Sequence, residues 1–107
     1  MESILNKLIK IKTNLSLGIV KFISEQDILV NLDGNVLKAN KDVEGNIHWE
    51  NKSVKIEPLE SALLQCVITP YIQKLISVVN SNEKLINKEF SLEDIQSMYL
   101  RKITICR

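Results

Sequence analysis

The stretch LESALLQCVITPYIQKLISVV, residues 59–79, decides the fold, because no other segment of the 107-residue chain is as long and as apolar. Apolar residues recur at helical spacing in two successive stripes. The stripes are Leu59, Ala62, Leu63, Cys66 and Val67, then Ile72, Leu75, Ile76 and Val79. A helix that is apolar on most sides is normally buried on more than one side. The sequence therefore predicts a central helix on which the rest of the chain packs.

Pro70 interrupts this stretch, because proline removes a backbone hydrogen bond inside a helix but is tolerated in the first turn. Two arrangements fit. One helix runs from about residue 58 to residue 80 with a kink at Pro70, or a first helix ends near Ile68 and Thr69 caps a second. A strand over residues 64–69 ranks third. A membrane span is excluded, because polar residues interrupt the run well before about 18 apolar residues; they are Glu60, Gln65, Gln73 and Lys74.

Length and composition predict one globular domain over residues 1–107, since 45% of the residues are hydrophobic and 25% are charged. Twelve lysines stand against two arginines. Arginine is preferred for bidentate contacts to phosphate and guanine, so this ratio disfavours a sequence-reading nucleic-acid binder.

The two cysteines, Cys66 and Cys106, lie in apolar surroundings and are expected to be reduced, buried residues. We expect no signal peptide, since lysines interrupt the apolar positions near the N-terminus at Lys7, Lys10 and Lys12. A cytoplasmic location is therefore expected.

Ahead of the central stretch the sequence predicts a short amphipathic helix over residues 2–15, ended by Gly18, and then strands. The apolar period becomes two in residues 19–22 and 28–32. Asp33-Gly34 is the signal of a two-residue type I′ hairpin turn. Residues 36–39 form the returning strand, and residues 40–46 a polar loop.

A second hairpin is expected over residues 47–56, with its bend at Asn51-Lys52. In this arrangement Ile47 and Trp49 share one face with Val54 and Ile56 opposite them, and His48 and Glu50 share the other face. Pro58 then closes the sheet.

In the C-terminal part, the sequence predicts a turn at residues 80–82, a helical turn at 83–87, a helix over 92–101 and a last strand over 102–106. Ser91 and Asp94 resemble a capping box at the start of that helix. The fold class is therefore α+β: an antiparallel β-meander of three to five strands packed on the central helix, with helices near both termini.

The sequence carries no catalytic signature. His48 and Glu50 resemble a base and its orienting group, but no nucleophile is placed near them. One histidine and two distant cysteines make no metal spacing, and the three glycines are assigned to turns rather than to a phosphate loop. We expect no catalytic residue, no metal and no cofactor.

Charge is unevenly distributed along the chain. Residues 25–60 carry eight acidic residues against four lysines, whereas the flanking segments are positive. Because the apolar side of each strand is buried, the acidic groups are expected on the outer face of the sheet and on its loops. Such a surface is either a solvated face or a docking surface for a basic protein.

The leading hypothesis is a small non-enzymatic protein-binding module that docks through this acidic β-face. In its most concrete form it is an immunity-type or inhibitor protein, from a bacterial or phage locus, that occludes a basic toxin or effector. The candidate contact residues are Asp33, Asp42, Glu44, His48, Trp49 and Glu50. Trp49 belongs to this set only if it is partly exposed.

Two alternatives remain open. The protein is a subunit or chaperone of a larger assembly that docks through its terminal amphipathic helices, or a weak nucleic-acid binder. The second alternative uses Lys7, Lys10, Lys12, Arg101, Lys102 and Arg107. The sequence predicts neither a membrane partner nor a particular oligomeric state.

Overall fold

The computed structural model describes residues 4–50 and 55–105, with backbone only at residue 81 and residues 99–105. These residues form an α+β fold, as the sequence predicts. The helices are α1 (Ile4–Thr13), α2 (Pro58–Val67), α3 (Thr69–Ser81) and α4 (Leu92–Ile105), with short 3-10 turns η1 (Leu15–Leu17) and η2 (Glu83–Leu85). The strands are β1 (Gly18–Phe22), β2 (Asp27–Leu32), β3 (Asn35–Lys41), β4 (Ile47–Glu50) and β5 (Glu89–Ser91).

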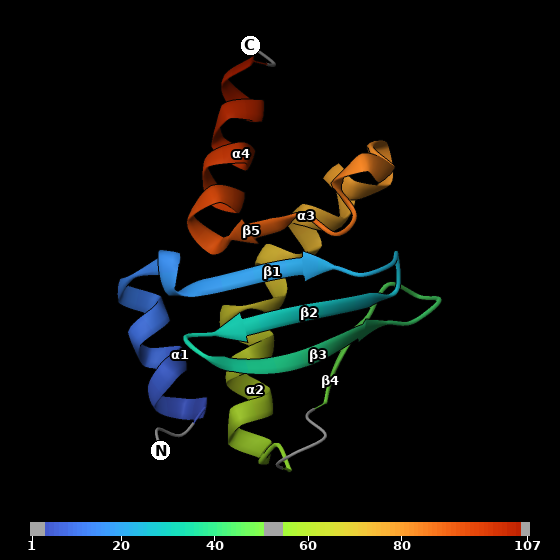
Figure 1. Cartoon of the computed structure of the whole chain (residues 1–107). Coiled ribbons are helices and arrows are strands. Elements are labelled where there is room, and N and C mark those ends of the chain that lie inside the picture. Colours follow the sequence, from blue (N-terminus) through green and yellow to red (C-terminus); the bar gives the residue numbers. More distant parts are fainter. Residues whose placement is uncertain (1–3, 51–54, 106–107) are drawn as a thin grey trace.

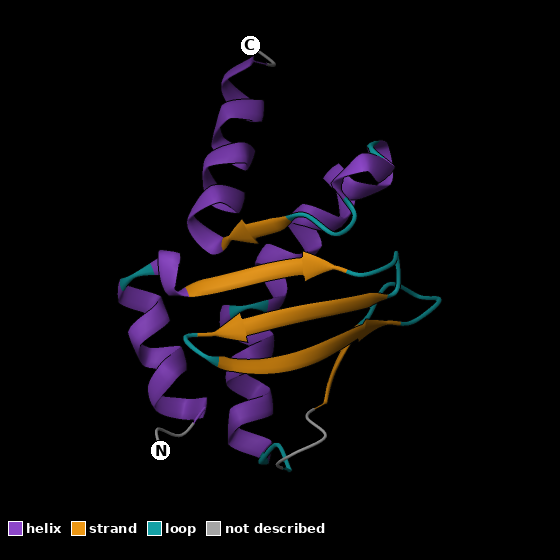
Figure 2. Ribbon diagram, in the orientation of Figure 1, coloured by secondary structure: helices purple, strands orange, loops and turns teal. Residues whose placement is uncertain are grey.

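The five strands form one antiparallel sheet in the order β4-β3-β2-β1-β5. The first four strands are the predicted meander, and β5 returns from the helical region to pair with the outer edge of β1. Helices α2 and α3 pass behind the sheet with α1 beside them, while α4 leaves beyond the β5 edge (Figures 1 and 2). One face of the sheet is therefore covered by helices and the other is open.

The predicted hairpin turn is confirmed. Leu32 and Asn35 face each other across β2 and β3, so the turn consists of Asp33 and Gly34 alone. Both residues have positive φ, 50° and 102°, as a type I′ turn requires. The side chain of Asn31 accepts a hydrogen bond of 2.7 Å from the Gly34 amide, which holds the turn further.

The core lies between the covered face of the sheet and the helices. Alternate residues of the strands point into it, which is the period-two pattern of the sequence. Its fully buried members from the strands and the central stretch are Val20, Ile28, Val30, Leu32, Ala39, Leu64, Ile68, Ile72 and Leu75.

The central stretch is divided into α2 and α3, which are bent by 48° relative to each other. Pro70 is the second residue of α3, where its missing amide costs no helical hydrogen bond. Thr69 does not cap α3 as the second arrangement predicts. Instead its hydroxyl donates to Gln65 Oε1 at 2.8 Å and accepts from Trp49 Nε1 at 3.1 Å.

The predicted burial of the first apolar stripe is wrong. Leu64 and Ile68 turn toward the sheet and are fully buried, whereas Leu59 is 62% exposed and Cys66 is exposed. The sheet covers only one side of α2, so the residues on its other side remain at the surface. The expected burial of Cys66 is therefore also wrong, and Cys106 lies outside the described residues.

Gly18 has a role that differs from the predicted one. Helix α1 ends at Thr13, and Gly18 begins β1 with an ordinary φ of −103°. A Cβ at this position would lie 2.8 Å from Leu92 Cδ1. Gly18 thus gives room to the buried Leu92 of α4, whose side chain would have to shift if a Cβ were present, and it does not end α1.

The last predicted strand is wrong as well, because residues 102–105 continue helix α4. The capping box at its start is confirmed: the Asp94 amide donates to Ser91 Oγ at 3.0 Å, and the Ser91 amide to Asp94 Oδ2 at 3.3 Å. The predicted return strand of the second hairpin is not formed at residues 55–57, which lie in no strand. Residues 51–54 lie outside the described part of the chain.

Among the described residues, no single helix is long and apolar enough to cross a membrane. Helices α2 and α3 together have sufficient length and apolar composition, but they are bent at their junction.

Candidate functional site

The open face of the sheet carries charges of both signs. At its centre the register aligns five residues across the five strands: Glu89, Lys21, Leu29, Lys38 and Glu50. Lys38 Nζ lies 3.7 Å from Asp27 Oδ1 and 3.9 Å from Glu50 Oε1. The lysines thus offset the carboxylates here, and the middle of the open face is not the acidic surface that the charge distribution predicts.

The acidic residues gather instead at one end of the sheet. The loops that follow β1 and β3 lie side by side there, at the right in Figure 1, and the Lys41 amide donates to the Gln26 carbonyl at 3.0 Å. We call this region the acidic end. Its carboxylates are Glu25, Asp27, Asp42 and Glu44, and they outnumber the lysine that lies among them, Lys41.

Asp42 holds the loop between β3 and β4 together. Its Oδ1 accepts hydrogen bonds of 2.9 Å from the amides of both Glu44 and Asn46, and its Oδ2 lies 2.8 Å from His48 Nε2. The hydrogen bond from His48, followed by that from the Asn46 amide, lowers the pKa of the Asp42 carboxyl. Asp42 is therefore a structural residue of the loop, and Glu44 is exposed beside it.

The six candidate contact residues are divided by the fold. Asp42, Glu44 and His48 lie at the acidic end, whereas Glu50 lies opposite Lys38 in the middle of the open face. Asp33 lies in the hairpin turn at the opposite end of the sheet, where its carbonyl accepts a hydrogen bond of 2.6 Å from Lys7 Nζ. Trp49 points to the covered face, is half-buried, and donates to Thr69.

An open hollow of about 520 Å³ lies at the acidic end between the β1–β2 loop and η2. Ile23 and Ile86 provide apolar surface, and Glu25 and Glu83 provide carboxylates. Sequence reasoning missed this hollow, because Ile23 and Glu83 are distant in sequence. The sequence carries one indication of the hollow at Ile23. This apolar residue directly follows the apolar Phe22, which interrupts the alternation of buried and partly exposed residues along β1.

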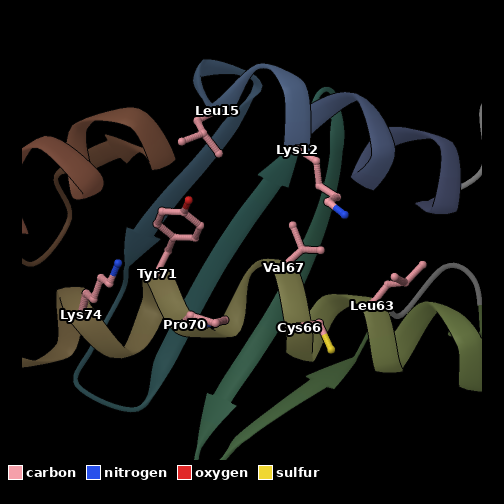
Figure 3. Close-up of a pocket in the computed structure, with 8 residues that line it drawn as sticks. All are labelled: Lys12, Leu15, Leu63, Cys66, Val67, Pro70, Tyr71 and Lys74. Atoms are coloured by element: carbon pink, nitrogen blue, oxygen red, sulfur yellow. The ribbon is translucent and has the colours of Figure 1, made fainter.

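A second hollow, of about 440 Å³, lies on the helical side between α1–η1 and α2–α3 (Figure 3). We call it the helical groove. Most of its wall is apolar and includes Leu15, Leu63, Val67 and Tyr71, with Cys66 at its edge. Lys12 and Lys74 also line it, and the Lys74 ammonium lies 5.3 Å from the centre of the Tyr71 ring.

His48 lines neither hollow, and its side chain is 66% exposed beside Asp42. Within residues 4–50 and 55–105, no three histidine, cysteine or carboxylate side chains are grouped to hold a metal ion. The arrangement presents charged and apolar surface for contact with another molecule.

Comparison of the chain with protein-family models, curated proteins and solved structures finds no match.

Proposed function

We propose that the protein is a non-catalytic protein-binding module that docks a basic partner through the acidic end. The observation that carries the proposal is the hollow between the β1–β2 loop and η2. It combines apolar surface at Ile23 and Ile86 with carboxylates at Glu25 and Glu83.

This combination matches the chemistry of a lysine or arginine side chain. The aliphatic stem of such a residue packs on apolar surface while its charged head meets a carboxylate. Ile23 is 41% exposed, so apolar area is present there for a partner to cover. Asp42 and Glu44 add negative charge at the same end of the sheet and would speed the encounter with a positive surface.

In its most concrete form the proposal is an immunity-type or inhibitor protein that occludes a basic toxin or effector. Such a partner would place its positive surface against the acidic end and be neutralised by contact alone, with no chemical step. The acidic surplus at one end of a small domain supports this form.

The test is a charge reversal that spares the structural carboxylate Asp42. We expect the double variant Glu25→Lys/Glu44→Lys to lose the basic proteins that wild type retains in affinity purification from its native host. Glu93→Lys is the control for reversing a carboxylate elsewhere, because Glu93 is exposed on α4 and lines neither hollow. Quantitative mass spectrometry of the three eluates gives the readout.

For the inhibitor form, a retained basic partner is expressed with each variant. Wild type and Glu93→Lys should restore growth of the producing cells, and the double variant should not. Retention of the same basic proteins by all three variants would contradict the docking surface.

Docking through the terminal helices is the second candidate. It is favoured by the course of α4, whose C-terminal half projects away from the sheet (Figure 1). If removal of residues 99–107 abolishes partner retention while the double reversal does not, this candidate replaces the first. The nucleic-acid alternative has less support, because α1 and the end of α4 lie on different sides of the molecule (Figure 1).

A further inference from the structure

We infer that the helical groove binds an acidic amphipathic segment of a second partner protein. This inference does not depend on the proposed function, because the groove and the acidic end share no residue.

The wall of the helical groove is mostly apolar. Leu63 and Val67 point from α2 toward α1, and Leu15 and Tyr71 complete the wall from η1 and α3 (Figure 3). These side chains are half-buried, and apolar exposure continues beyond the groove at Ile9 and Leu59. An apolar groove between helices accommodates the apolar side chains of a helix laid along it.

The charged side chains that line the helical groove are positive. Among the described residues that line the groove, the charged ones are Lys12 from α1 and Lys74 from α3, and none is a carboxylate. Figure 3 shows both side chains at the rim, with the apolar residues between and beside them. Charge complementarity therefore selects a segment whose apolar residues are accompanied by aspartate or glutamate.

Helix α4 of a second copy of this chain is a poor occupant of the groove. The helix that projects from the body is α4, and its C-terminal half contains Arg101 and Lys102. Placing this basic segment against Lys12 and Lys74 would bring like charges together, which is unfavourable. An acidic segment of another protein is the occupant that the charges favour.

The test uses two designed peptides of about four helical turns with the same apolar positions. One carries glutamate at its polar positions and the other carries lysine. We expect the glutamate peptide to bind roughly tenfold more tightly in fluorescence anisotropy at low salt, and added salt should reduce the difference. The variant Lys12→Glu/Lys74→Glu should reverse this preference.

The matched control is Lys84→Glu/Lys88→Glu, which makes the same change of charge at two exposed lysines outside the groove. It should keep the preference for the glutamate peptide. Equal affinity of the two peptides for wild type, or a reversal by the control variant as well, would overturn the inference.

The reactivity of Cys66 reports where the peptide binds, because this cysteine is exposed at the edge of the groove. In a Cys106→Ser background, the glutamate peptide should slow the alkylation of Cys66 by iodoacetamide. An unchanged rate at saturating peptide would show that the peptide binds elsewhere. Protection by oleate but not by the peptide would identify an anionic amphiphile as the occupant and overturn the inference.

Discussion

The two faces of the sheet are made by the same strands and differ in what covers them. On the covered face, Val30 and Leu37 are directly opposite each other and fully buried under the helices. On the open face, Leu29 and Lys38 are opposite each other and only half-buried. The comparison shows that stability is concentrated on one face, which leaves the other face and its loops available for contacts with a partner.

Replacing a leucine by alanine on each face of the sheet tests this difference most directly. Leu37→Ala removes a side chain that is 1% exposed and should cost about 2–5 kcal/mol, because burial is lost and a cavity remains. Leu29→Ala, in the neighbouring strand, should cost about 1 kcal/mol or less, since its side chain is already half in water. Urea unfolding of both variants measures the two losses.

Equal losses for the two leucine variants would mean that the open face is covered in solution, by a second copy or by another part of the chain. Sedimentation of the wild type at the same concentration would separate these two explanations.

The second prediction concerns the turn that joins the two central strands. Gly34→Val should cost about 1–3 kcal/mol, because φ at this position is +102° and a β-branched residue resists positive φ. Space is not the obstacle, since the nearest outside atom to an added Cβ is Lys7 Nζ at 3.5 Å. Gly34→Asn is the control, because asparagine tolerates this conformation and should cost less.

Thermal unfolding of the wild type and both Gly34 variants gives the measurement. If valine and asparagine lower the melting temperature by the same amount, backbone strain is not the cause.

These two regions also show what the sequence can and cannot predict. The Asp33-Gly34 turn was predictable because its determinant is local: two adjacent residues must both adopt positive φ. The orientation of α2 was not, because its sequence is apolar on several sides and the position of the sheet decides which side is buried. Leu64 is fully buried and Leu59 is 62% exposed for that reason alone.

The candidate surface was predicted only in part. Asp42 and Glu44 lie in one loop, so their proximity follows from the sequence, whereas Glu50 lies opposite Lys38 in the middle of the open face. Strand β5 was missed, since three residues are too few to show a period. Because β5 was not predicted, the position of η2 against the β1–β2 loop was not predicted either. The hollow lined by both Glu25 and Glu83 was missed for the same reason.

The last prediction concerns the exposed loop of the acidic end, where the effect on stability should be the smallest. The pKa of Asp42 is lowered by its hydrogen bonds to His48 and to the Asn46 amide. A carboxyl with a lowered folded-state pKa contributes stability above its ordinary value of about 3.9 and loses it as the pH falls through the folded-state pKa. The free-energy difference between wild type and Asp42→Asn should therefore shrink as the pH is lowered below about 4.

Because His48 is the largest cause of the shift, His48→Gln should raise the pKa of the Asp42 carboxyl toward its ordinary value. An NMR titration of the Asp42 side-chain carboxyl carbon in wild type and variant measures the change directly. The loop should persist in the variant, since the amides of Glu44 and Asn46 still donate to Oδ1. An Asp42 pKa that does not change in His48→Gln would show that the backbone amides alone lower it, and that His48 is free to contact a partner at the acidic end.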